Sequence, residues 1–182
     1  MSKRSGTSIQ RFRVPLGFLF GVVFLIFAQP EFVTLICGGA IAVVGILIRA
    51  WASGHIRKNQ NLAVSGPYAY TRNPLYLGSF VLGLGFTIAS GVWWLGVIFV
   101  ALFLGVYLPV MRVEAKDLTE LFGADYAEYA RRVPLLFPRI TPYEASSEKF
   151  DMNLYLRYRE YRAALGLIFA WFILALKAFF HV

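Results

Sequence analysis

Cysteine, histidine and acidic residues are all scarce in this 182-residue chain. There is one cysteine, Cys37, and there are two histidines, His55 and His181. A lone cysteine excludes an internal disulfide, and because no Cys/His cluster has metal-ligand spacing, we expect no metal site. Charged residues make up only 15% of the chain, against about a quarter in soluble domains, whereas 58% is hydrophobic. This composition indicates a membrane protein.

The few charges are mostly positive. Lys and Arg number 18 against 10 Asp and Glu, which leaves a net charge of +8. A basic excess can indicate nucleic-acid binding, but here the basic residues flank apolar segments and form no polar face with interleaved aromatic residues. We therefore expect no nucleic-acid partner, and we expect the charge to meet anionic lipid headgroups.

Long apolar runs dominate the rest of the chain. Hydropathy predicts five spans, over residues 14–28, 32–51, 74–89, 92–111 and 163–180. Gly38, Gly39 and Gly45 are small residues suited to close helix packing in the second span. The first run lacks a small-residue cleavage site and is expected to stay as a helix. The prediction is an all-α polytopic membrane protein, a single domain over 1–182 with about five transmembrane helices and short cytoplasmic amphipathic helices.

The distribution of Lys and Arg predicts the orientation. The two connections around Pro30 and Gly91 carry no Lys or Arg, and Lys177 alone lies near that side. By the positive-inside rule, segments 1–13, 52–73 and 112–162 are cytoplasmic. We expect the N-terminus on the cytoplasmic side and the C-terminus on the opposite side.

The stretch GPYAYTRNPLYLG, residues 66–78, is unusual for the mouth of a hydrophobic span. Pro74 suits the first position of the third span, which presents Arg72 and Asn73 at a helix N-terminus. Free backbone N–H groups and a guanidinium fork favour a carboxylate or phosphate there. Tyr68, Tyr70 and Tyr76 add aromatic faces for an adenine or a cation. An interfacial belt of Tyr and Arg would show the same residues, and their spacing does not decide between the two.

Two further polar stretches follow. The first, from residue 111 to 140, begins with a charged helix in which Glu114 lies close enough to the fourth span to face the same pocket as Arg72. Gly123 is a plausible end for this helix, and Asp125 can cap a second one. A solvated amphipathic helix is the alternative. The second stretch, NLYLRYREYRAALG, indicates an interfacial helix that contacts lipid headgroups rather than a catalytic element.

The stretch GPYAYTRNPLYLG and the polar stretch that contains Glu114, in this order around a two-span hairpin, resemble the isoprenylcysteine carboxyl methyltransferase and phospholipid methyltransferase family. The resemblance covers about residues 49–139. The family motif R-H-P-x-Y-x-G corresponds to 72–78 here, with Asn73 in place of histidine. Asn can hydrogen-bond but cannot carry a proton, which puts acid/base chemistry at that position in doubt. Of the family's paired glutamates, only Glu114 is kept, and Ala115 follows it.

The resemblance implies a membrane methyltransferase that uses S-adenosylmethionine and methylates a carboxylate or amine on a lipid or lipid-linked acceptor at the cytoplasmic face. It implies that Arg72 and Glu114 are the catalytic residues. The cofactor-binding residues would be Tyr70, Arg72, Asn73, Tyr76, Gly78 and Glu114. Further candidates, for contact with the substrate or a headgroup, are His55, Arg131 and Arg132.

Two other functions remain open from the residues alone. A membrane reductase of sterol-reductase-like architecture would bind NADPH, and His55, Arg57 and Lys58 are basic residues suited to its phosphate. A non-catalytic membrane protein could use the basic face to bind lipid. The sequence names neither the methyl acceptor nor the oligomeric state.

Overall fold

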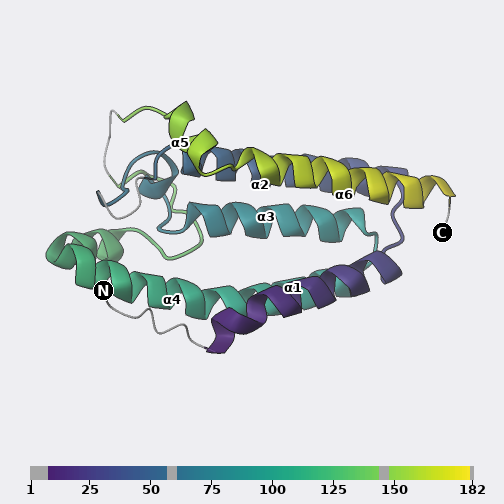
Figure 1. Ribbon diagram of the computed structural model, residues 1–182, viewed down its shortest axis with the longest axis horizontal. Coiled ribbons are helices and arrows are strands. Elements are labelled where there is room, and N and C mark those ends of the chain that lie inside the picture. The colour runs from purple at the N-terminus through teal and green to yellow at the C-terminus, as the bar shows by residue number, and fades with distance from the viewer. Residues whose placement is uncertain (1–7, 57–60, 144–147, 181–182) are drawn as a thin grey trace.

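The computed structural model describes residues 8–56, 61–143 and 148–180 (Figure 1). Its helices are α1 (Ser8–Phe27), α2 (Phe32–Ser53), α3 (Pro74–Ala89), α4 (Trp93–Arg132), α5 (Met152–Arg157) and α6 (Tyr161–Phe180), with a 3-10 turn, η1 (Gly66–Ala69). No strand occurs in these three ranges. The predicted all-α class is confirmed.

The five long helices lie along one axis, with α3 between a layer of α2 and α6 and a layer of α1 and α4 (Figure 1). Helices α2, α4 and α6 are each long and apolar enough to cross a membrane, and two shorter apolar helices, Pro15–Phe27 and α3, accompany them. The chain is therefore an integral membrane protein, since apolar helices of this length are stable spanning a bilayer.

Helices α2 and α3 pack closely because glycines face each other across their interface. A Cβ atom on Gly45 would lie 2.7 Å from the carbonyl oxygen of Gly78, and one on Gly85 would lie 2.6 Å from that of Gly38. Small residues let helix backbones approach in this way in membranes. Gly39 instead faces the indole of Trp171 on α6, at 3.2 Å from its added Cβ. The packing role predicted for the three glycines of α2 is confirmed.

Helix α4 extends well beyond the predicted span. It continues past Met111 to Arg132, and Gly123, at φ 56° and ψ −123°, divides it into two helical pieces. A glycine tolerates this conformation because it has no Cβ. The expected break at Gly123 is confirmed. Up to Gly123 the polar part of α4 continues its apolar part without a break, which brings Glu114 over the start of α3.

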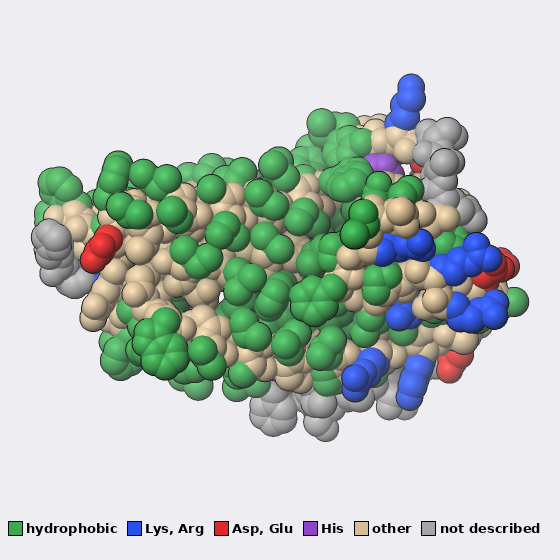
Figure 2. Space-filling model, turned by 180° about the vertical axis from the view of Figure 1, so that it is seen from behind, with side chains coloured by type: hydrophobic (Ala, Val, Ile, Leu, Met, Phe, Trp, Pro, Cys, Tyr) green, Lys and Arg blue, Asp and Glu red, His purple; other side chains and the backbone are tan. Residues whose placement is uncertain are grey.

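Basic side chains gather at one end of the elongated molecule, and its long sides are largely apolar (Figure 2). Exposed large hydrophobic residues on the sides include Phe32, Leu47, Ile168 and Phe172. A charged end with apolar flanks is the arrangement of a protein embedded in lipid.

Candidate functional site

A cavity of about 550 Å³ lies at the basic end, between the end of α2, the loop before α3, the first turns of α3 and the polar part of α4. Four of the residues predicted for the site line it, namely Arg72, Asn73, Tyr76 and Glu114. They come from segments separated by some forty residues of sequence, and the hairpin of α3 and α4 returns the chain to the same end. The structure therefore brings the core of the predicted site together.

The loop before α3 is held by the segment 133–143 that follows α4, which we call the clasp. Backbone and side-chain groups of residues 69–73 bond to it along its length. The bonds are Arg72 N–H to Pro134 O (3.0 Å), Thr71 Oγ1–H to Leu136 O (2.8 Å), Asn73 Nδ2–H to Leu135 O (2.9 Å), Arg139 N–H to Tyr70 O (3.0 Å) and Tyr143 N–H to Ala69 O (2.9 Å). These bonds satisfy polar groups that burial would otherwise leave unpaired.

The Arg72 guanidinium retains unused donor capacity. Its Nη1 donates to the hydroxyl of Tyr126 at 3.3 Å, whereas its Nε is buried and has no hydrogen-bond partner among the described residues. A buried donor without a partner is uncommon in native structures and is costly. The geometry fits an anion in the cavity, which a guanidinium binds through two parallel bonds.

Glu114 lies on α4 across the same cavity. Its Oε1 accepts a hydrogen bond from the hydroxyl of Tyr76 at 2.9 Å. The Tyr76 ring in turn packs against Tyr107 of α4, with ring centroids 5.4 Å apart. The carboxylate is thus oriented by a tyrosine that is itself held by ring packing, and it can bind a cation or a hydroxyl donor.

Two further tyrosines form the cavity wall. The hydroxyl of Tyr129 donates to the carbonyl of Tyr68 at 2.7 Å. Burial raises the pKa of both phenols well above the ordinary range, and a neighbouring tyrosine raises the pKa of each further. The Arg72 guanidinium acts in the opposite direction and lowers the pKa of Tyr129. Both rings therefore stay neutral, because the ionised form would be poorly solvated there.

Tyr70 and Gly78 do not line the cavity. The Tyr70 ring lies near Trp51, at 6.4 Å between centroids, and its carbonyl bonds the clasp. A Cβ on Gly78 would lie 2.6 Å from Cγ of Arg49 and 2.8 Å from the carbonyl of Gly45, so its close approach is to α2. Both residues shape the site from outside.

The three headgroup candidates also lie outside the cavity lining. His55 is buried, and its Nδ1 lies 2.9 Å from the carbonyl of Trp51. Arg131 is exposed, and Arg132 is exposed and pairs with Glu128 at 2.8 Å. Arg57 and Lys58, considered for a dinucleotide phosphate, lie outside the described residues.

Sequence reasoning missed several residues at this cavity. Arg49 of α2, Ser79 of α3 and Tyr107 of α4 line it, and Glu160 bonds to Arg49. Their sequence context is apolar or interfacial, so only a polar residue inside a span (Arg49) was available as a signal. Within the described ranges, no group of three or more His, Cys, Asp or Glu is arranged to hold a metal ion.

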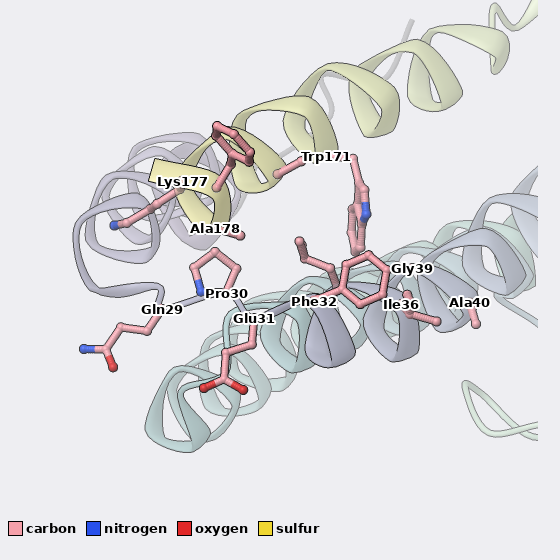
Figure 3. Close-up of a pocket in the computed structure, with 13 residues that line it drawn as sticks. Gln29, Pro30, Glu31, Phe32, Ile36, Gly39, Ala40, Trp171, Lys177 and Ala178 are labelled. Atoms are coloured by element: carbon pink, nitrogen blue, oxygen red, sulfur yellow. The ribbon is translucent and has the colours of Figure 1, made fainter. Parts of the chain in front are cut away.

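A larger cavity, of about 1070 Å³, lies at the opposite end between the α1–α2 turn, α2 and α6 (Figure 3). Its walls are mostly apolar, with Phe32, Ile36 and Trp171 among them. Lys177 borders it and donates to the carbonyls of Leu25 and Ile26 at 2.7 and 3.1 Å. None of the predicted site residues lines this cavity.

The sequence model of the phospholipid methyltransferase family matches residues 32–125, just over half of the chain. The matched region runs from the start of α2 to the polar part of α4. It thus contains Arg72, Asn73, Tyr76 and Glu114.

Three curated relatives match over longer segments. The cobalt-zinc-cadmium resistance protein CzcN of Cupriavidus metallidurans is 37% identical over 65% of this chain and 55% of its own length. The nickel-cobalt-cadmium resistance protein NccN of Alcaligenes xylosoxydans xylosoxydans is 36% identical over 60% and 51%, respectively. The protein-S-isoprenylcysteine O-methyltransferase of Schizosaccharomyces pombe is 27% identical over 68% and 55%.

The chain spans about half the length of each of these relatives. No solved structure matches it. Two of the names refer to resistance to metal ions and one to methyl transfer onto isoprenylcysteine. The family match over more than half of the chain, which includes Arg72, Asn73, Tyr76 and Glu114, shows that this chain belongs to the phospholipid methyltransferase family.

Proposed function

We propose that the chain transfers a methyl group from S-adenosylmethionine to a lipid or lipid-linked acceptor, a carboxylate or an amine, at the cytoplasmic face of the membrane. The observation that carries this proposal is the buried Nε of Arg72, which has no partner in the described part of the chain, in a cavity that Glu114 also lines. A free cationic donor and an oriented carboxylate in one cavity fit a ligand that carries charges of both signs.

The cavity suits S-adenosylmethionine in size and chemistry. Its volume of about 550 Å³ falls within the roughly 300–1,000 Å³ usual for small-molecule sites. Arg72 would hold the carboxylate of the amino-acid portion, and Glu114 its ammonium or the ribose. Tyr68 and Tyr76 present aromatic surface to the remainder.

The other predicted cofactor residues would act on the architecture of the site. Asn73 holds the clasp with its amide, Tyr70 does so with its carbonyl, and Gly78 lets α3 approach α2. The Asn73 amide, bonded to a carbonyl and unable to carry a proton, serves the architecture of the site.

When bound, S-adenosylmethionine supplies an electrophilic methyl group on a positively charged sulfur. The residues of this chain align donor and acceptor and exclude water, for which Leu62, Leu118 and Phe122 provide apolar lining. Charge diminishes as a cationic sulfonium reacts with an anion, so a dry site favours the reaction. A carboxylate acceptor needs no base, whereas an amine must first lose a proton.

The position of the cavity supports a lipid acceptor. It lies at the basic end of a bundle whose flanks are apolar, so a substrate anchored in the bilayer can present its polar group there. The positive-inside rule supports a cytoplasmic location for this end and for the N-terminus, with the C-terminus opposite. The family name favours a phospholipid, and the name of the yeast relative favours an isoprenylcysteine, so we propose the acceptor only as a class.

The test is direct binding to the purified protein in lipid nanodiscs, by calorimetric titration of S-adenosylhomocysteine and, separately, of NADPH. We expect saturable binding of S-adenosylhomocysteine and none of NADPH. Of the basic residues that favour the reductase hypothesis, His55 is the one that the structure describes, and it is buried outside the cavity lining. Binding of NADPH alone would favour the reductase, and binding of neither would favour a non-catalytic lipid-binding protein.

A further inference from the structure

Arg49, near the end of α2, carries an ion pair at the edge of the cavity. Its Nη2 donates to Oε2 and Oε1 of Glu160 at 2.7 and 3.0 Å, and its Nε donates to Oε2 at 3.1 Å. The side chains are only 22% and 15% exposed, so solvent screens this pair less than a surface one. Two-point contacts of this kind fix orientation as well as contributing energy.

The other side of the same guanidinium contacts α3. Nη1 donates to the carbonyl of Leu75 at 3.3 Å and to Oγ of Ser79. Ser79 Oγ itself donates to Leu75 O at 2.9 Å. Leu75 lies directly beside Tyr76 in the first turn of α3, so Arg49 connects the helix start that carries the site to the residue just before α6.

The backbone directly before Glu160 is strained. The preceding residue, Arg159, has φ 55°, and it is the one non-glycine residue with positive φ in the described ranges. Such a conformation is unfavourable for an L-residue and persists only where the surrounding structure imposes it. Here it occurs at the turn between α5 and α6 that delivers the carboxylate to Arg49.

We propose that Glu160 is a positioning residue for the donor site: through Arg49 it holds the first turn of α3 and so sets where Tyr76 and Arg72 stand relative to Glu114. This inference rests on the proposed function. Glu160 lies outside residues 32–125, the part that the family model matches, and directly before α6.

Removing the carboxylate has two consequences. Arg49 is left with a partly buried charge that lacks its counter-ion, which is unfavourable. Glu114 and Asp117 line the same cavity, so the freed guanidinium turns toward them. It then competes for the carboxylate that would hold the cationic part of the donor, and the hold on Leu75 loosens.

The test is the affinity for S-adenosylhomocysteine of Glu160→Gln in nanodiscs, measured by calorimetry beside its thermal unfolding. We expect the affinity to fall about tenfold, within the coupling usual for one hydrogen-bonded network. Glu160→Asp keeps the charge but is shorter, so its affinity should fall less. In a double-mutant cycle with Arg49→Lys, the two losses should not add.

Lys177→Gln is the matched control. It removes the attachment of α6 to α1 at the opposite end, so it tests whether α6 docking alone matters. We expect its affinity for S-adenosylhomocysteine to equal that of the wild type. An equal loss in Lys177→Gln and Glu160→Gln, or no loss in Glu160→Gln while the wild type binds, overturns the inference.

A wild type that binds no S-adenosylhomocysteine overturns the proposed function instead. Should Glu160→Gln not fold, Glu160→Asp carries the test, and an affinity identical to that of the wild type overturns the inference.

Discussion

The two ends of the bundle each hold a cavity, and the cavities differ in how far the hydrogen bonds of their cationic side chains are satisfied. At the far end the space is larger, about 1070 Å³ against about 550 Å³, yet its walls are mostly apolar and the amine of Lys177 is satisfied by carbonyls of α1. At the basic end, the Nε of Arg72 is buried and meets no hydrogen-bond partner within residues 8–56, 61–143 and 148–180. Unsatisfied polar chemistry, rather than volume, distinguishes the candidate site.

The far cavity also differs in how it is built. It lies between α2 and α6, where Trp171 rests against Gly39, and it is continuous with lipid-facing surface such as Phe32 and Phe179. The site cavity is lined by the end of α2, the loop before α3, the start of α3 and the polar part of α4, and the clasp bonds that loop from outside the lining. Hydrogen bonds hold the walls of the site cavity in place, whereas apolar packing holds those of the far cavity.

Among the variants that test this difference between the two ends, Arg72→Ala is expected to have the largest effect on binding and activity. Losing the guanidinium should abolish measurable methyl transfer and S-adenosylhomocysteine binding. The unfolding temperature of the ligand-free protein should change little, because among the described residues the Arg72 side chain hydrogen-bonds only to Tyr126, at the long distance of 3.3 Å. Arg72→Lys keeps the charge but not the planar fork, so its affinity should also fall markedly.

Calorimetry of both variants and thermal unfolding of the ligand-free proteins check this expectation. Wild-type affinity in Arg72→Lys would assign the loop to anchoring at the membrane surface. Collapse of the ligand-free fold in Arg72→Ala would likewise make the residue structural.

A smaller effect is expected from Glu114→Gln. The amide keeps the shape and can still accept from Tyr76, but it loses the charge that would face an ammonium or a ribose. Loss of a charged hydrogen bond costs about 1.5–3 kcal/mol, or roughly tenfold to a hundredfold in affinity. The affinity is measured by the same calorimetric titration with S-adenosylhomocysteine. The matched control is Glu120→Gln, on the exposed side of α4. Equal affinities in both variants would return Glu114 to the solvated surface of α4.

The smallest effect is expected from Lys177→Gln on stability. Its ammonium meets carbonyls at the C-terminal end of α1, where a cation contributes about 0.3–1 kcal/mol. Thermal unfolding in nanodiscs should show a small decrease in the unfolding temperature. A drop in methyl-transfer rate comparable to that of Glu114→Gln would contradict the separation of the two ends.

Much of the site was predictable because its residues are close in sequence to recognisable signals. Pro74 after Arg72-Asn73 predicts a helix start that presents both side chains, and the structure begins α3 at Pro74. The break at Gly123 was likewise predictable from the residue type. Tyr70 and Gly78 belong to the same motif, but motif membership does not say which way a residue faces, and both face away from the cavity.

The sequence by itself determined the class of protein: apolar runs long enough for a bilayer, basic residues at one set of helix ends, and glycines where α2 and α3 meet. Each of these follows from local composition and helical periodicity. Only the tertiary structure decided which polar groups meet, since the clasp, the Tyr76–Glu114 bond and the Arg49–Glu160 pair join residues 38 to 111 positions apart. Contacts at such separations depend on how helices cross and where loops return, which is set by the packing of the whole bundle and not by any single segment.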